Sequence, residues 1–175
     1  MNILIVVLRL IHIIGGVFWV GTALIMAFFI TPSIQVTAEA GQRFLGHLIT
    51  KTPLGPIHGL SAILTVLAGV SLYWIDSQGF TSDWMTSASG LGFGIGGIFG
   101  FFGVITSIVH ALNLRSLAGA TQSQGKPTPE QMDKIQATQK RLGVIGRVDS
   151  IVLLLALSFM ATARYWRFNN TSSSP

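Results

Sequence analysis

Long apolar runs separated by polar connections are the main pattern along this chain. Four windows are apolar over enough length to cross a bilayer: residues 3–30, 57–75, 91–112 and 148–163. One helical crossing needs about 20 apolar residues, and these runs do not alternate as the strands of a membrane barrel do. The pattern therefore predicts an all-α fold, an integral membrane four-helix bundle, because helices satisfy their own backbone groups in lipid. The bundle is expected to span residues 1–168, with a disordered tail at 169–175.

Two polar connections carry further local signals. Residues 38–50 mix polar and apolar positions, which predicts a short helix at the membrane interface. Residues 121–129 read as a polar linker. Thr128, Pro129 and Glu130 then have the order of an N-cap, a first helical position and a first-turn acid. We expect this helix to reach about Leu142 and to continue into the fourth crossing.

The composition agrees with a membrane protein. Half of the residues are hydrophobic (50%), 10% are charged and the mean hydropathy is +0.62, whereas a soluble domain has about 25% charged residues. The chain has no cysteine, which excludes disulfides, thiolate metal sites, iron–sulfur clusters and covalently attached haem. The first apolar run is longer than the core of a signal peptide, so we expect it to be retained.

The formal charge of +5 is unevenly distributed among the connections. The interhelical segment 113–147 and the first connection are basic, whereas the second connection carries only Asp76 and Asp83. Lys and Arg favour the cytoplasmic side, so both termini are expected outside, in a bacterial cytoplasmic membrane. Basic residues at a membrane surface attract anionic lipid headgroups, and no nucleic acid is expected.

Three histidines lie inside or at the rim of the apolar windows: His12, His58 and His110. Ionisable side chains at membrane depth are functional candidates by default. His58 lies one turn into the second crossing and His110 about one turn before the end of the third, so antiparallel helices place both at the inner membrane level. Two neutral imidazoles facing each other suit the axial ligation of a b-type haem (heme b). The alternative is that each histidine only makes a hydrogen bond between helices.

His12 lies nearer the outer face, and the length of the helix predicts a separation of roughly 20 Å or more from His58. That is too far for the two side chains to ligate one iron. His12 therefore ligates a second haem near the outer face, donates to a propionate or a quinone, or pairs with a neighbouring helix. Arg9 and Arg164 are placed to receive propionates at the outer rim, although snorkelling to headgroups is the favoured role for both.

Small residues form a stripe along the third window. Gly92, Gly96, Gly100 and Gly103 recur at helical spacing, and the stripe continues through Ser107 to His110. The stripe either lets helices pack closely or offers a smooth face, with Gly103 on it, to a flat ring such as a porphyrin or quinone.

Asp149 lies inside the apolar run of the fourth crossing, where a carboxylate must be paired or protonated. Together with Arg147 it marks the inner end of that run. Three roles are open for Asp149: fixing the tautomer of a ligating histidine, relaying protons, or forming an ion pair with Arg147 or Arg115.

The first crossing also carries a resemblance. Residues 10–21 (LIHIIGGVFWVG) and 160–165 (MATARY) resemble small bacterial membrane proteins that include CopD-like copper-resistance domains, HemJ-type protoporphyrinogen oxidases and the membrane domain of PuuD-type urate oxidases. The resemblance implies a membrane-embedded b-type haem or metal site that includes His12. The chain departs from these groups because it lacks clustered methionines for copper and lacks the third-helix lysine of the HemJ-type enzymes.

The sequence thus predicts a haem protein that carries electrons to or from quinone or a partner redox subunit. Its expected partners are the lipid bilayer and other membrane subunits or a second copy of the chain. Two alternatives stay open. One is a cofactor-free structural subunit of a larger complex, and the other is a small metal transporter, of copper for example, that uses His12, His58 and Asp149.

Overall fold

The chain folds into helices joined by short connections. The computed structural model describes residues 2–121 and 128–166, and within them there is no strand, which confirms the all-α prediction. The main helices are α1 (Ile3–Ile25), α2 (Thr31–Lys51), α3 (Leu54–Asp76), α4 (Ala88–Thr121) and α5 (Pro129–Thr162); shorter elements are the π-helix η1 (Met26–Ile30) and the 3₁₀ turns η2 (Asp83–Thr86) and η3 (Ala163–Tyr165). The predicted tail at 169–175 and linker residues 122–127 lie outside the described residues.

Four helical stretches are long and apolar enough to cross a membrane, as the sequence predicts. They are Ile3–Thr37, Leu54–Asp76, Ala88–Arg115 and Gln136–Tyr165. Large apolar side chains point outward along them, for example Ile3 (77% exposed) and Val36 (83% exposed). Such surfaces would be unfavourable in water but suit lipid, so the outside of the bundle is apolar and its polar groups gather inside.

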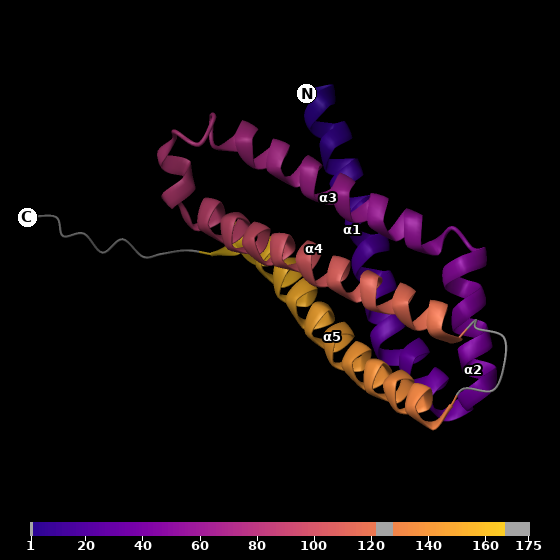
Figure 1. The fold of residues 1–175 in the computed structure, drawn as a ribbon. Helices are drawn as coiled ribbons and strands as arrows, with labels where there is room; N and C mark the ends of the chain where they lie inside the picture. The colour runs from indigo at the N-terminus through magenta and orange to yellow at the C-terminus, as the bar shows by residue number, and fades with distance from the viewer. Residues whose placement is uncertain (1, 122–127, 167–175) are drawn as a thin grey trace, which may run out of the picture.

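The helices form two closely packed pairs, α1 with α3 and α4 with α5. Figure 1 shows α4 and α5 side by side, and it places α2 at the end of the bundle opposite to the connection between α3 and α4. A buried cluster of Trp19, Ala23, Ala62 and Leu153 joins the pairs. Side chains from α1, α3 and α5 therefore meet at the centre of the molecule.

Small residues allow the close approach within each pair. A Cβ atom on Gly96 would lie 2.7 Å from Met160 Cγ, and one on Gly103 would lie 2.5 Å from Leu153 Cδ2. Between α1 and α3, a Cβ atom on Gly15 would lie 2.6 Å from Thr65 Oγ1. Gly96 and Gly103 of the predicted stripe therefore pack against α5, and the face of Gly103 is covered by protein side chains.

The chain folds back on itself within α2. A Cβ atom on Gly41 would lie 2.7 Å from Ile34 Cα, seven residues earlier, a separation that in a straight helix would be about 10 Å. Ile34 and Leu45 share a buried cluster with Leu142 of α5. The bend returns the end of α2 to the bundle, where it packs near the end of α4 and the first half of α5.

Candidate functional site

His58 on α3 and His110 on α4 lie in the same part of the bundle, near enough for their charges to influence each other. The Nδ1 atom of each ring is buried and has no hydrogen-bond partner. Gly146 leaves room for His110, because a Cβ atom there would lie 3.2 Å from the Cε1 atom of the ring. The two side chains that the helix register pairs are therefore both partly buried, and each has an unsatisfied ring nitrogen.

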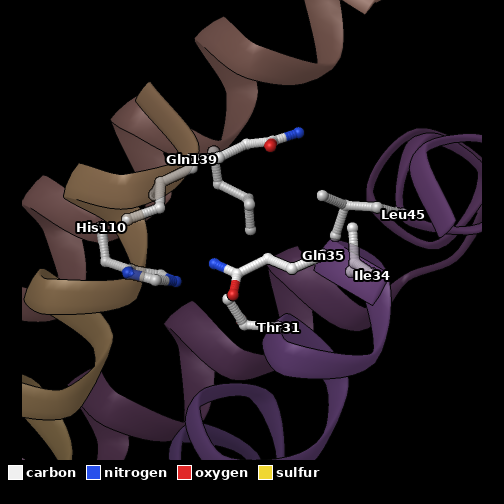
Figure 2. Close-up of a pocket in the computed structure, with 8 residues that line it drawn as sticks. Thr31, Ile34, Gln35, Leu45, His110 and Gln139 are labelled. Atoms are coloured by element: carbon white, nitrogen blue, oxygen red, sulfur yellow. The ribbon is translucent and has the colours of Figure 1, made fainter. Parts of the chain in front are cut away.

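A small cavity borders His110. Figure 2 shows the imidazole facing the side chain of Gln35 across it. The volume is about 20 Å³, enough for about one water molecule. The lining residues are Thr31, Ile34, Gln35, Leu45, His110, Leu114, Gln139 and Leu142. Gln139 Nε2 is buried without a partner as well, so the region around this cavity has two unsatisfied polar nitrogens.

No sequence pattern singled out Thr31, Gln35 or Gln139 as residues of the site. Thr31 and Gln35 follow the first apolar window and Gln139 precedes the fourth, so all three lie outside the predicted crossings. Part of this arrangement could have been predicted, because Thr31 and Gln35 are four residues apart and so share a helix face. The turn of α2 that brings this face towards His110 could not be read from that spacing.

His12 takes one of the three roles expected for it, pairing with a neighbouring helix. Its Nδ1 atom lies 2.7 Å from the carbonyl oxygen of Thr65. A carbonyl only accepts hydrogen bonds, so Nδ1 carries the proton and Nε2 keeps its lone pair. Gly69 provides the space, because a Cβ atom there would lie 2.8 Å from Cε1 of the ring.

His12 lies well away from His58 along α3. Its ring contacts Thr65 and Gly69, which follow His58 by seven and eleven residues, a rise of about 10–17 Å. His12 and His58 are therefore too far apart to ligate one iron together.

Asp149 is the best-enclosed acidic side chain of the site, with 4% of its surface exposed. Ser107 Oγ lies 3.2 Å from Oδ1 and 3.1 Å from Oδ2 of the carboxyl group, and Thr106 Oγ1 contacts Oδ1. Trp19 Nε1 donates a hydrogen bond to Ser107 Oγ over 3.2 Å. This group of four side chains, the Asp149 cluster, links α1, α4 and α5.

The ion pair considered for Asp149 does not form. Within the described residues the ion pairs are Arg43 with Glu39 and Lys134 with Glu130, both on helix surfaces. Arg147 and Arg115 are exposed. Arg147 and Asp149 are two residues apart on α5, so their side chains point to nearly opposite sides of the helix. The carboxyl group is satisfied by hydroxyl groups instead, and Thr106 is the partner that sequence reasoning missed.

The two arginines expected at the outer rim, Arg9 and Arg164, are both exposed. Exposed arginine side chains can reach lipid headgroups. His47, in α2, is exposed too. Among the described residues, no group of three or more His, Asp or Glu side chains is placed to hold a metal ion.

Four apolar spans around buried polar side chains define an integral membrane protein. Residues 6–162 match the family described as predicted integral membrane protein (DUF2269), and the chain belongs to that family. No curated protein and no solved structure matches it. The chain is therefore shown to be a member of the DUF2269 family. Its membership of the CopD-like, HemJ-like or PuuD-like groups is not shown.

Proposed function

We propose that this membrane protein binds a b-type haem between His58 and His110 and carries electrons to or from quinone or a partner redox subunit. One observation carries the proposal: two imidazoles from different candidate membrane spans lie near enough for their charges to interact, and each has a buried Nδ1 atom without a partner. Buried polar atoms are usually satisfied, so an unsatisfied pair calls for a ligand or a bound water.

The donor set fits haem. Two neutral imidazoles are a standard axial pair for haem iron in helical bundles, and no cysteine is required. The cavity of about 20 Å³ beside His110 is far smaller than a ligand pocket of roughly 300–1,000 Å³. Side chains around the cavity, Gln35 and Gln139 among them, must therefore move when a porphyrin ring is accommodated.

The chain's own residues would hold the group and control its surroundings. His58 and His110 would supply the two nitrogen lone pairs. The apolar side chains of the cavity wall, such as Leu45, Leu114 and Leu142, exclude water and keep the local dielectric constant low, which tunes a reduction potential. When bound, haem supplies one-electron redox chemistry.

His12 is proposed as a separate ligand nearer the outer face. Its hydrogen bond to the Thr65 carbonyl leaves the Nε2 lone pair free, and ligating histidines commonly donate their other ring N–H to a carbonyl or carboxylate. The same bond also supports the purely structural alternative, in which His12 only joins α1 to α3. The exposed Arg9, one turn earlier, would meet propionates or lipid headgroups.

Haem content tests the proposal. The full chain is produced with the haem precursor supplied, purified in detergent, and assayed for extractable haem per chain. We expect bound haem in the wild type and in His47→Ala, whose side chain is exposed, and a large loss in His58→Ala and His110→Ala. A folded wild-type chain without haem would contradict the proposal and favour the cofactor-free structural subunit.

A further inference from the structure

Asp149 is a buried titratable group that haem binding does not use. It lies near the middle of the fourth span, Gln136–Tyr165, and is 4% exposed. Leaving a carboxylate at this depth without compensation is costly. Its partners are hydroxyl groups, Ser107 and Thr106, and not a basic side chain. The question is which protonation states this arrangement stabilises.

The number of hydrogens in the Asp149 cluster limits the possible hydrogen-bond patterns. The indole of Trp19 can only donate, so Ser107 Oγ accepts from Trp19 and its single hydrogen is free for Asp149. Thr106 also has a single hydrogen but three acceptors within reach: Asp149 Oδ1 and the carbonyl oxygens of Phe102 and Gly103, each 3.1 Å away. Thr106 can therefore turn its hydrogen towards the carboxyl group or towards its own helix.

Two complete hydrogen-bond patterns follow. When Asp149 is ionised, its carboxylate accepts from both Ser107 and Thr106. When Asp149 is protonated, it still accepts from Ser107, donates its own hydrogen to Thr106 Oγ1, and Thr106 donates to a carbonyl of α4. Neither state leaves a buried donor or acceptor of the cluster unpaired, so a proton can bind or leave through rotation of one hydroxyl group.

The groups around Asp149 do not hold it in one state by an ion pair. α1 faces it with the uncharged Trp19, and α4 faces it with Thr106 and Ser107, with His110 one turn further along. On α5 the nearest charged neighbour is the exposed Arg147, and α3 contributes His58 at the inner level. His12 is bonded to the Thr65 carbonyl on the outer side. Within the described residues, Asp149 forms no salt bridge.

We propose that Asp149 is a proton-exchange site inside the membrane, with the hydroxyl of Thr106 as the switch that accommodates the proton. The step conserves atoms and charge: a proton from water adds to Oδ1 of the carboxylate, and Thr106 redirects its hydrogen to the carbonyl of Phe102 or Gly103. The reverse step returns the proton to water. His110, which borders the small cavity, packs on Gly146, one turn before Asp149 along α5.

Proton exchange at Asp149 does not depend on haem binding. A structural carboxylate that merely ties α1, α4 and α5 together would stay in one protonation state at all pH values at which the protein is folded. A proton-exchange site changes state while the fold is unchanged. The two roles are therefore separated by observing the carboxyl group itself, without a redox measurement.

The experiment is infrared difference spectroscopy of the full chain in liposomes, labelled with ¹³C-aspartate, from acidic to alkaline pH. The chain has four aspartates, and the other three, Asp76, Asp83 and Asp133, are exposed. We expect one isotope-sensitive band of a protonated carboxyl group in an apolar environment, which disappears reversibly as the pH rises. The band should be lost in Asp149→Asn, a replacement of the same shape.

Two hydroxyl variants complete the test. Thr106→Val keeps the side-chain shape but removes the switch, so the band should shift in frequency and in titration midpoint. Ser158→Ala is the matched control, because Ser158 is exposed and its hydroxyl donates to the carbonyl of Leu154. The Asp149 band of this variant should have the frequency and titration midpoint of the wild-type band. A band that persists in Asp149→Asn, or an Asp149 signal that does not change with pH, would overturn the proposal.

Discussion

At the scale of single residues, the position of His12 depends on the missing side chain of Gly69. The ring lies between the Thr65 carbonyl, 2.7 Å from Nδ1, and the space a Cβ atom would take at Gly69. A histidine inside a membrane helix interface must have both a partner and room. This pair of constraints fixes both the ring position and its tautomer.

Gly69→Ala tests that constraint. The new methyl group would lie 2.8 Å from His12 Cε1, so the ring must move and its bond to Thr65 should be lost. We expect destabilisation by about 1–3 kcal/mol, typical of overpacking, measured as a lower midpoint of thermal unfolding in detergent. The control is Gly97→Ala, where nothing lies within 4 Å of the added atom; its midpoint should not fall. Equal midpoints for both variants would show that Gly69 does not constrain His12.

Residue spacing predicts that His58 and His110 lie at one level, but it did not predict the partners of Asp149. Two histidines near the matching ends of antiparallel helices share a level however the helices are rotated about their axes. The hydroxyl groups around Asp149 depend on which face of α4 turns towards α5, and an apolar run with serine, threonine and glycine does not specify that face. The sequence also left three roles open for Asp149, and the exposed position of Arg147 removes the ion pair with that residue.

At the scale of helices, the contact between α4 and α5 depends on glycines that face the partner. Gly92 lies against η3, where a Cβ atom would approach Ala163 Cβ to 2.7 Å and Ala163 Cα to 2.8 Å. Backbone atoms cannot swing away as a flexible side chain can. An added methyl group must therefore push the helices apart.

Gly92→Ala should lower the thermal midpoint of the detergent-solubilised chain more than Gly100→Ala. Gly100 lies on the same helix and belongs to the same predicted stripe, yet an added Cβ atom there meets nothing within 4 Å. Size-exclusion chromatography after stepwise heating measures both variants alongside the wild type. If Gly100→Ala were the more damaging of the two, the described packing of α4 on α5 would be incorrect.

The helices also show where sequence patterns stop being informative. Length and hydropathy located the four crossings because a bilayer demands about 20 apolar residues. The bend at Gly41 within α2 leaves no such signature, because it places one mixed segment against another through the contacts of Ile34, Leu45 and Leu142. That bend is what completes the cavity beside His110, so this part of the site could not be predicted.

At the scale of the whole molecule, the bundle places polar groups at three levels inside an apolar shell. His12 lies against Thr65 and Gly69 of α3, the Asp149 cluster links α1, α4 and α5, and His110 borders the cavity that α2 helps to enclose. A membrane protein that keeps such groups inside must compensate their desolvation. Binding haem at one level and exchanging a proton at another would use these groups together.

The most direct test of the account is whether the bound group is redox-active. The detergent-purified full chain is examined by visible absorption spectroscopy, first oxidised, then after a soluble quinol is added, and again after the corresponding quinone is added in excess. We predict sharp b-type bands that appear with quinol and reverse with quinone, in the wild type and in His47→Ala but not in His58→Ala or His110→Ala. A spectrum that shows no bands, or bands unchanged by both reagents, would contradict the proposed electron-carrying function.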